Sequence, residues 1–368
     1  MLLIVWILLI IMGLFYKKSK WIAFLEIMYS SLMMAFNSNN PDWGGYLRTF
    51  ENVKISFNNI YSGNVLFNIL LYIFGIFNNY NIALYGIVLL SFILLYKGIK
   101  YYTDSTAYVL GLYLIAPFVI DATQVKNFVA MSIWIYFSRY LYEAVKIRRV
   151  DRNTILYILG VAIATGVHYS FIFTLVFLVC IYLDLKTVKN FLLSIVLLLL
   201  SVWGIRNIYP ILRLISNSGI SFINIALKKM GDYEINYNFS NASARFKVTL
   251  LFFIIVLLFL FCINKLCISE KNKEYQIYLF VLKLTIVSVF IFPMLLYSQE
   301  MYRMQRNMLI FYYILIEVVS PGKIIVKKKL IVNRVISTAI GLILGVYYLY
   351  TDSIIWNYET VFVTLFRF

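Results

Sequence analysis

The sequence is poor in the residues that build metal sites and disulfide frameworks. It has one histidine, His168, and three cysteines, Cys180, Cys262 and Cys267, among 368 residues. The cysteines fall mostly within apolar stretches and have neither the spacing of a zinc site nor the pattern of a disulfide-rich domain. The carboxylates form no cluster that would suit a hard cation. We therefore expect no metal and no cofactor.

Charged residues are also scarce. They make up 13% of the chain, whereas 62% of it is hydrophobic, and this is more apolar surface than a soluble domain of this size can bury. Apolar runs of about 16–22 residues alternate with short charged turns, which matches the thickness of a bilayer. The sequence predicts an all-α fold, a polytopic integral membrane protein whose single transmembrane domain covers residues 1–368.

Acidic residues are fewer than basic ones, and the net charge is +17. A basic chain invites a nucleic-acid function, but the lysines and arginines concentrate in the short turns between apolar runs. This is the distribution that the positive-inside rule produces. We therefore expect membrane lipid, and no nucleic acid, as a partner.

The apolar runs predict about twelve transmembrane helices with both termini outside. The run at 63–77 is short, and a crossing there would reverse the charge bias of the following turns, so we expect a re-entrant or interfacial helix. Outer segments are expected at about 37–80 and 207–245. Spans are expected at about 2–16, 21–36, 81–96, 106–120, 127–143, 153–168, 170–183, 190–206, 246–264, 277–297, 307–320 and 330–350.

The first run is not expected to be a cleaved signal peptide. Lys17, Lys18 and Lys20 follow it instead of preceding it, and no small-residue cleavage site is present. We expect an uncleaved first helix with its N-terminus outside.

Residues 121–170 form the stretch around which the chain is organised. A polar patch, 121–127, precedes one apolar run, a basic turn at 146–152 follows it, and a second apolar run ends at His168. Two spans joined by a short turn form an antiparallel hairpin. Lys126 and His168 are therefore expected at the same membrane face.

Positive-inside bias does not explain the cations at outer helix ends, which are Lys126, Arg206, Arg245, Arg303 and Arg306. Arg303 and Arg306 are three residues apart and would share one face of a helix. Two guanidinium groups on one face suit a phosphate or pyrophosphate, which accepts bidentate hydrogen bonds. Each arginine can equally be a snorkelling helix terminus or a partner of Glu300.

His168 and Asp42 are the candidate proton-transfer groups. An imidazole at the outer end of a helix can take a proton near neutral pH, although a lone histidine is more often a packed or hydrogen-bonded residue. Asp42 lies beside Pro41 and before Gly44-Gly45, so it can also be an ordinary turn residue.

The order of these motifs resembles the EpsG family of polysaccharide polymerases, relatives of the Wzy-type polymerases. Asn40-Pro41-Asp42-Trp43-Gly44-Gly45-Tyr46 matches a Pro-Asp motif followed by Tyr, and His168-Tyr169-Ser170 matches a His-x-Ser motif. Tyr302-Arg303 with Arg306 and Tyr312-Tyr313 matches a late Tyr/Arg motif. One position departs from the pattern, because Lys126-Asn127 stands where the family has Arg-Gln. A cation and an amide are kept, but lysine cannot grip a phosphate bidentately.

The resemblance implies a multi-pass enzyme of the bacterial plasma membrane with its active site facing outside. Such an enzyme joins oligosaccharide repeat units carried on polyprenyl pyrophosphate, making capsular, exopolysaccharide or O-antigen polymer. An acceptor hydroxyl attacks the donor's anomeric carbon and polyprenyl pyrophosphate leaves. Flippase and chain-length regulator proteins would be partners.

The same resemblance suggests roles for particular residues. Arg303, Arg306 and Lys126 would stabilise the pyrophosphate, and His168 or Asp42 would be the base. Tentative sugar contacts are Asn127, Tyr46, Trp43, Tyr302 and Arg245.

Three other functions fit parts of the pattern. A glycan ligase would use the same donor, and a transporter or flippase of lipid-linked oligosaccharides would also have about twelve spans. A transporter should show repeat-related halves and discontinuous helices, which are not evident in the sequence. A membrane scaffold without activity is the remaining alternative.

Overall fold

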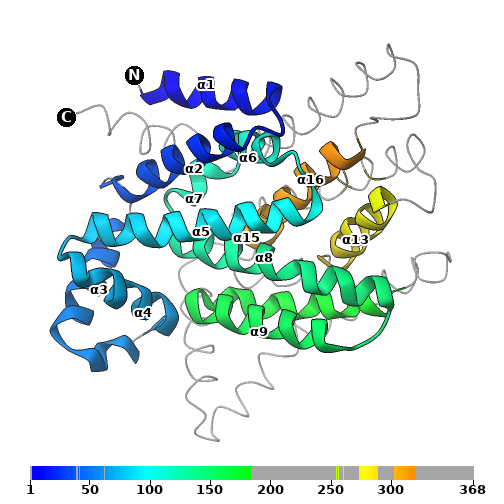
Figure 1. The fold of residues 1–368 in the computed structure, drawn as a ribbon. Coiled ribbons are helices and arrows are strands. Elements are labelled where there is room, and N and C mark those ends of the chain that lie inside the picture. Colours follow the sequence, from blue (N-terminus) through cyan, green and yellow to red (C-terminus); the bar gives the residue numbers. More distant parts are fainter. Residues whose placement is uncertain are drawn as a thin grey trace, which may run out of the picture.

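The computed structural model describes residues 2–183 apart from 39, 41 and 62, the single positions 254, 256 and 260, and residues 273–288 and 302–319 (Figure 1). Within these ranges every regular element is a helix and no residue is in a strand. The predicted all-α class is therefore confirmed. The expected spans at 190–206 and 330–350, most of 246–264 and the outer segment 207–245 lie outside the described residues.

In the N-terminal half of the chain, the helices begin and end close to the predicted bounds of the apolar runs. The 106–120 run is divided, because Pro117 cannot continue the helix and Ala116 before it is extended. The elements are α1 (Leu2–Phe15), α2 (Lys20–Ala35), α5 (Tyr80–Tyr102), α6 (Thr106–Ile115), α7 (Phe118–Asp121), α8 (Val125–Ile147), α9 (Arg152–Val167), the 3-10 helix η3 (Tyr169–Ile181), α13 (Lys273–Ser288), α15 (Tyr302–Asn307) and α16 (Leu309–Val319).

Among the described helices, α5 is long and apolar enough by itself to cross a bilayer, and several shorter helices are strongly apolar. The number of spans thus stays a prediction. Helix starts are set by side-chain caps: the Asn79 side chain accepts from Ile82 N, and Asp151 accepts from Asn153 N and Thr154 N.

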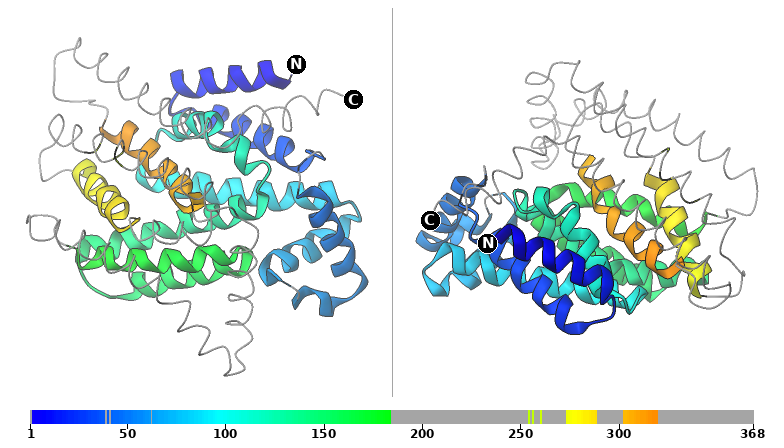
Figure 2. Two further views of the ribbon diagram at one scale, coloured as in Figure 1. Left: turned by 180° about the vertical axis from the view of Figure 1, so that it is seen from behind. Right: turned by 90° about the horizontal axis from the view of Figure 1, so that it is seen from above.

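Helix α8 lies between α5 and α9 (Figures 1 and 2). It runs parallel to α5, since Phe92 packs on Phe128 with ring centroids 4.4 Å apart and, ten residues further along both helices, Tyr102 hydrogen bonds to Ser138 at 2.9 Å. It runs antiparallel to α9 because only a short turn joins them. The starts of α5 and α8 and the end of α9 therefore lie toward one end of the bundle.

The opposite end of the bundle collects the basic turns. Lys17, in the turn between α1 and α2, pairs with Glu317 at 2.6 Å, and Ser105 donates to the same carboxylate at 2.9 Å. Lys273 at the start of α13 donates to the carbonyl of Tyr101 near the end of α5. Of the turns predicted to be inside, the described ones after α1 and after α5 thus lie on one side of the molecule, together with the start of α13.

The outer segment 37–80 is more helical than the sequence analysis predicts. The expected short helix at 63–77 is present as α4 (Val65–Phe74) with the 3-10 turn η2 (Gly75–Phe77), and at about 1.5 Å per residue α4 is too short to cross a bilayer. Before it come α3 (Trp43–Ile55) and the 3-10 helix η1 (Phe57–Tyr61), neither of which is predicted. In Figure 2, α3 and α4 lie together beside the start of α5.

Close contact between α5 and α8 depends on Gly98. A Cβ at this position would lie 3.0 Å from Ile135 Cγ2 and 3.1 Å from the Ile135 carbonyl oxygen. We expect Gly98→Leu to destabilise the protein by about 1–3 kcal/mol through overpacking, read as a lower melting temperature in detergent. Gly45→Leu is the control, because nothing lies within 4 Å of that Cβ. Equal melting temperatures for the two variants would contradict this packing.

Candidate active site

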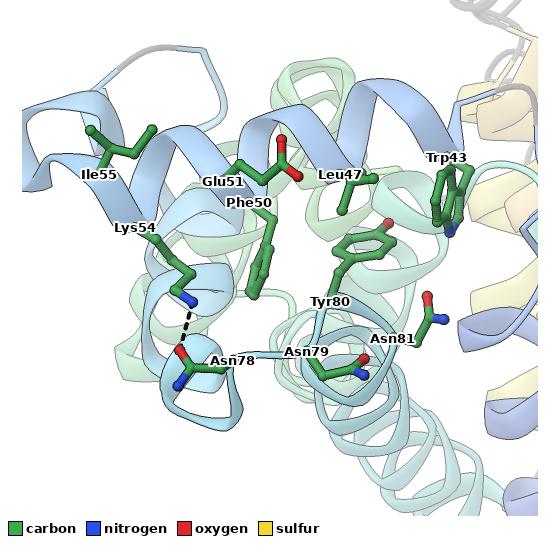
Figure 3. Close-up of a pocket in the computed structure, with 10 residues that line it drawn as sticks. All are labelled: Trp43, Leu47, Phe50, Glu51, Lys54, Ile55, Asn78, Asn79, Tyr80 and Asn81. Atoms are coloured by element: carbon green, nitrogen blue, oxygen red, sulfur yellow. Dashed lines mark hydrogen bonds between the residues drawn. The ribbon is translucent and has the colours of Figure 1, made fainter.

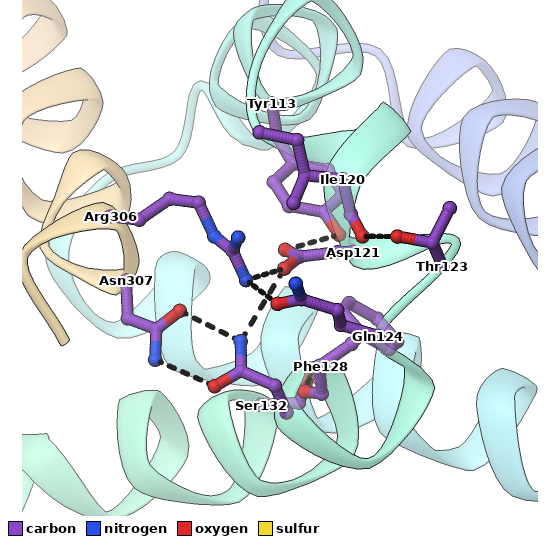
Figure 4. A network of polar contacts seen from close by, with 10 residues as sticks. Tyr113, Ile120, Asp121, Thr123, Gln124, Phe128, Ser132, Arg306 and Asn307 are labelled. Carbon is purple, nitrogen blue, oxygen red and sulfur yellow. Dashed lines mark hydrogen bonds and ion pairs between the residues drawn. The ribbon is translucent and has the colours of Figure 1, made fainter. Parts of the chain in front are cut away.

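The polar patch between α7 and α8 encloses a buried ion pair (Figure 4). Arg306 Nη2 donates to Asp121 Oδ1 at 3.0 Å and to Gln124 Oε1 at 2.7 Å. Both charged side chains have 0% exposure. Tyr113 donates to the other carboxylate oxygen at 3.1 Å, so Asp121 is held from several helices. Charges this deeply buried persist only when they are paired and hydrogen-bonded.

A pair of amide side chains extends this network to the first turn of α8. Asn127 Nδ2 donates to Asn307 Oδ1 at 3.2 Å, and Asn307 Nδ2 donates back to Asn127 Oδ1 at 3.4 Å. Asn127 Nδ2 also lies 3.4 Å from Asp121 Oδ1. The late segment of the chain is thereby joined to the 121–127 turn.

Lys126 is held over two aromatic rings. Its Nζ lies 4.9 Å from the ring centroid of Tyr46 in α3 and 5.0 Å from that of Phe67 in α4. Cation–π contacts of this kind hold an ammonium group in place while it stays half-buried. Helices α3 and α4 thus position Lys126, the residue that stands where the motif pattern has arginine.

Asp42 joins the same cluster through Tyr46. The Tyr46 hydroxyl donates to Asp42 Oδ2 at 3.2 Å. Burial, together with the negative charge of Asp42, raises the pKa of Tyr46 well above its ordinary value, so this phenol keeps its proton. Asp42 itself is exposed at the start of α3.

The chain before α3 is tied to the buried network. Asn40 Nδ2 donates to the carbonyl oxygen of Ala122 at 3.2 Å, and Asn40 Oδ1 accepts from the Asp42 amide at 2.9 Å. One residue therefore fixes the position of Asp42 relative to the 121–127 turn. The Asp42, Tyr46 and Lys126 cluster is adjacent to the Asp121–Arg306 network.

His168 follows the last residue of α9 and is half-buried. Its Nδ1 lies 2.7 Å from Ser170 Oγ, a contact that orients the ring. The neighbouring Tyr169 donates its hydroxyl hydrogen to the carbonyl oxygen of Gly63, which leads into α4. The His-x-Ser motif is thus attached to the same outer segment that supports Lys126.

The other predicted residues are placed as follows. Arg303 is half-buried in α15, three residues before the enclosed Arg306, and Tyr302 begins this helix. Trp43 is half-buried at the start of α3. Arg245 lies outside the described residues. Among those that are described, no three His, Cys, Asp or Glu side chains group as metal ligands would.

Sequence reasoning missed the central carboxylate. Asp121, Gln124 and Asn307 are not among the predicted site residues, although the sequence does mark 121–127 as a polar patch. The signal in the sequence is an acid directly after an apolar run, followed by an amide three residues later. Its partner Arg306 lies 185 residues further along the chain, so no local sequence pattern indicates that the two residues pair.

The comparisons with known proteins agree with the motif order. The model of the EpsG family matches residues 20–360, nearly the whole chain. No curated protein and no solved structure matches. The chain therefore belongs to the EpsG family, a family of Wzy-type polymerase-like membrane proteins with an exopolysaccharide polymerase-like role.

Proposed function

We propose that this protein polymerises oligosaccharide repeat units carried on polyprenyl pyrophosphate at the outer face of the bacterial plasma membrane. The observation that carries the proposal is the convergence of Asp42, Lys126, His168 and the Arg303–Arg306 helix around one end of the bundle in an EpsG-family chain. The basic turns lie at the opposite end. With those turns inside, the candidate site faces outward.

The reaction needs few groups from the protein. An acceptor hydroxyl oxygen forms a bond to the donor's anomeric carbon while the bond from that carbon to the pyrophosphate oxygen breaks. The hydroxyl proton passes to a base, and polyprenyl pyrophosphate departs with the bonding electrons. Because the leaving group gathers negative charge, preorganised cations lower the barrier.

The half-buried cations Lys126 and Arg303 suit direct contact with the pyrophosphate. Arg306 is enclosed and paired with Asp121, so its proposed contribution is to fix the 121–127 turn and to add positive potential behind the site. Asn127, Trp43, Tyr46 and Tyr302 remain proposed sugar contacts, as does Arg245.

His168 is the proposed base, oriented by Ser170, with Asp42 as the alternative. We expect His168→Ala to slow polymerisation by about 10²–10⁴-fold, the usual contribution of general base catalysis. The measurement is polymer length and lipid-linked single units in cells whose own gene carries the variant, with protein levels in the membrane checked alongside. Asp42→Asn is made in parallel. If His168→Ala retains long polymer and Asp42→Asn loses it, Asp42 is the base.

The same cells separate the alternative functions. A polymerase defect leaves single lipid-linked units on the outer leaflet, whereas a flippase defect leaves them on the inner leaflet. A ligase defect leaves long polymer attached to the lipid. Normal polymer from both variants would contradict the proposed site.

A further inference from the structure

A pocket of about 690 Å³ lies between α3 and the start of α5 (Figure 3). Its volume is within the range of about 300–1,000 Å³ that small-molecule sites occupy. Its walls carry aromatic, amide and charged groups, and it is separate from the Asp121–Arg306 network. The lining residues are Trp43, Leu47, Phe50, Glu51, Lys54, Ile55, Asn78, Asn79, Tyr80 and Asn81.

One wall of the pocket is aromatic. Tyr80 packs edge-to-face on Trp43, with ring centroids 5.9 Å apart, and on Phe50, with centroids 5.7 Å apart. The other wall carries three asparagines, Asn78 and Asn79 just before α5 and Asn81 in its first turn. Aromatic faces pack against the C–H faces of pyranose rings, and amide groups donate to and accept from hydroxyls. The combination suits a carbohydrate.

Three polar atoms at one end of the pocket lack protein partners in the described part of the chain. They are Trp43 Nε1, Tyr80 OH and Asn81 Oδ1, each buried and without a hydrogen bond. Figure 3 shows the three side chains together at that end. Together they supply one hydrogen-bond donor, one hydroxyl that can donate or accept, and one acceptor. Buried polar groups are normally hydrogen-bonded, so this set points to a ligand with hydroxyl groups.

The charges in the pocket argue against an anionic ligand. Glu51 and Lys54 have opposite signs, and Lys54 Nζ is already engaged with Asn78 Oδ1 at 2.6 Å. The pocket has no excess of positive charge that would stabilise a pyrophosphate, in contrast to the region of Lys126 and Arg303. A largely neutral, hydroxyl-rich glycan is the better match.

The pocket opens beside the candidate active site. Trp43 directly follows Asp42, and Tyr46, one turn along α3, contacts both Asp42 and Lys126. We propose that this α3–α5 pocket binds sugar residues of the oligosaccharide chain and presents its end to Asp42 and Lys126. This subsite rests on the proposed polymerase function, and it would retain the growing chain between additions.

The test measures binding by the purified full-length protein in detergent. The probe is a set of oligosaccharides, free of pyrophosphate, released by hydrolysis from the host cell's own polymer. We expect Tyr80→Phe and Asn81→Ala each to weaken binding by about 3–10-fold, the effect of one hydrogen bond. Trp43→Ala should weaken it more, because it removes a stacking face as well as a donor.

Tyr72→Phe is the matched control for Tyr80→Phe. It removes a tyrosine hydroxyl from the exposed surface of α4, outside the pocket. Unchanged affinity in both Tyr80→Phe and Asn81→Ala would overturn the proposal. It would also be overturned if inorganic pyrophosphate displaced the fragments and bound more weakly to the same two variants, since the pocket would then be an anion site.

Polymer length in cells distinguishes this subsite from the proposed function. If deletion of the gene leaves polymer intact while fragments still bind through Tyr80 and Asn81, the polymerase proposal fails and the glycan pocket stands. If deletion abolishes long polymer but the pocket variants bind fragments and make polymer of normal length, the pocket proposal alone fails. We expect the pocket variants to make shorter chains.

Discussion

Arg306→Ala is expected to lower the free energy of unfolding by about 3–5 kcal/mol, because it leaves the buried carboxylate of Asp121 without its ion-pair partner. The same change removes the hydrogen bond to Gln124. In cells this variant should accumulate poorly in the membrane. In detergent its melting temperature, followed by tryptophan fluorescence, should fall well below that of the wild type.

A double variant tests the physical cause. Asp121→Asn combined with Arg306→Met removes both charges, so we expect it to be more stable than Arg306→Ala alone. Arg303→Ala is the matched control, since it deletes a half-buried guanidinium from the same helix and should cost less stability. If Arg306→Ala kept the wild-type melting temperature and lost only polymer, Arg306 would act on substrate and not on the fold.

The second large effect is expected at the cations that remain partly accessible. Arg303→Ala and Lys126→Met should each reduce polymerisation by about 10²–10³-fold, the usual result of removing one preorganised group that stabilises developing negative charge. Both membrane levels and melting temperatures should stay nearer to those of the wild type than in Arg306→Ala. The measurement is the ratio of polymer to lipid-linked single units.

Lys126→Arg is the informative companion variant. The EpsG-family pattern has arginine at this position, and a guanidinium can also stack on the rings of Tyr46 and Phe67. We therefore expect Lys126→Arg to keep much more activity than Lys126→Met. If the two variants lost polymer equally, the side chain's role would be packing within the cluster and not its charge.

The arrangement has a simple physical logic. A reaction that creates a pyrophosphate leaving group needs fixed positive charge, yet charge at a membrane surface is costly unless it is held and paired. Aromatic rings hold Lys126, and the Asp121 carboxylate holds Arg306. In the proposed site, the buried Asp121–Arg306 pair maintains the structure, and the half-buried Lys126 and Arg303 are the cations proposed to contact substrate.

The class of protein follows from the amino-acid sequence alone. The apolar runs and the basic turns predict helices that the structure contains, because burying a helix backbone in lipid requires internal hydrogen bonds over a bilayer-length run. The short turn at 146–152 also predicts that Lys126 and His168 lie at one end, since α8 and α9 can only run antiparallel. Motif order alone pointed to the family that residues 20–360 match.

The accessibility of each cation and the groups that surround it depend instead on tertiary packing. Arg303 and Arg306 look alike in sequence, yet one is half-buried and the other is sealed against Asp121, because that carboxylate comes from a turn far away in the chain. Helix α3 and its pocket also depend on packing against the start of α5. Contacts between distant segments decide these features, and local spacing carries no information about them.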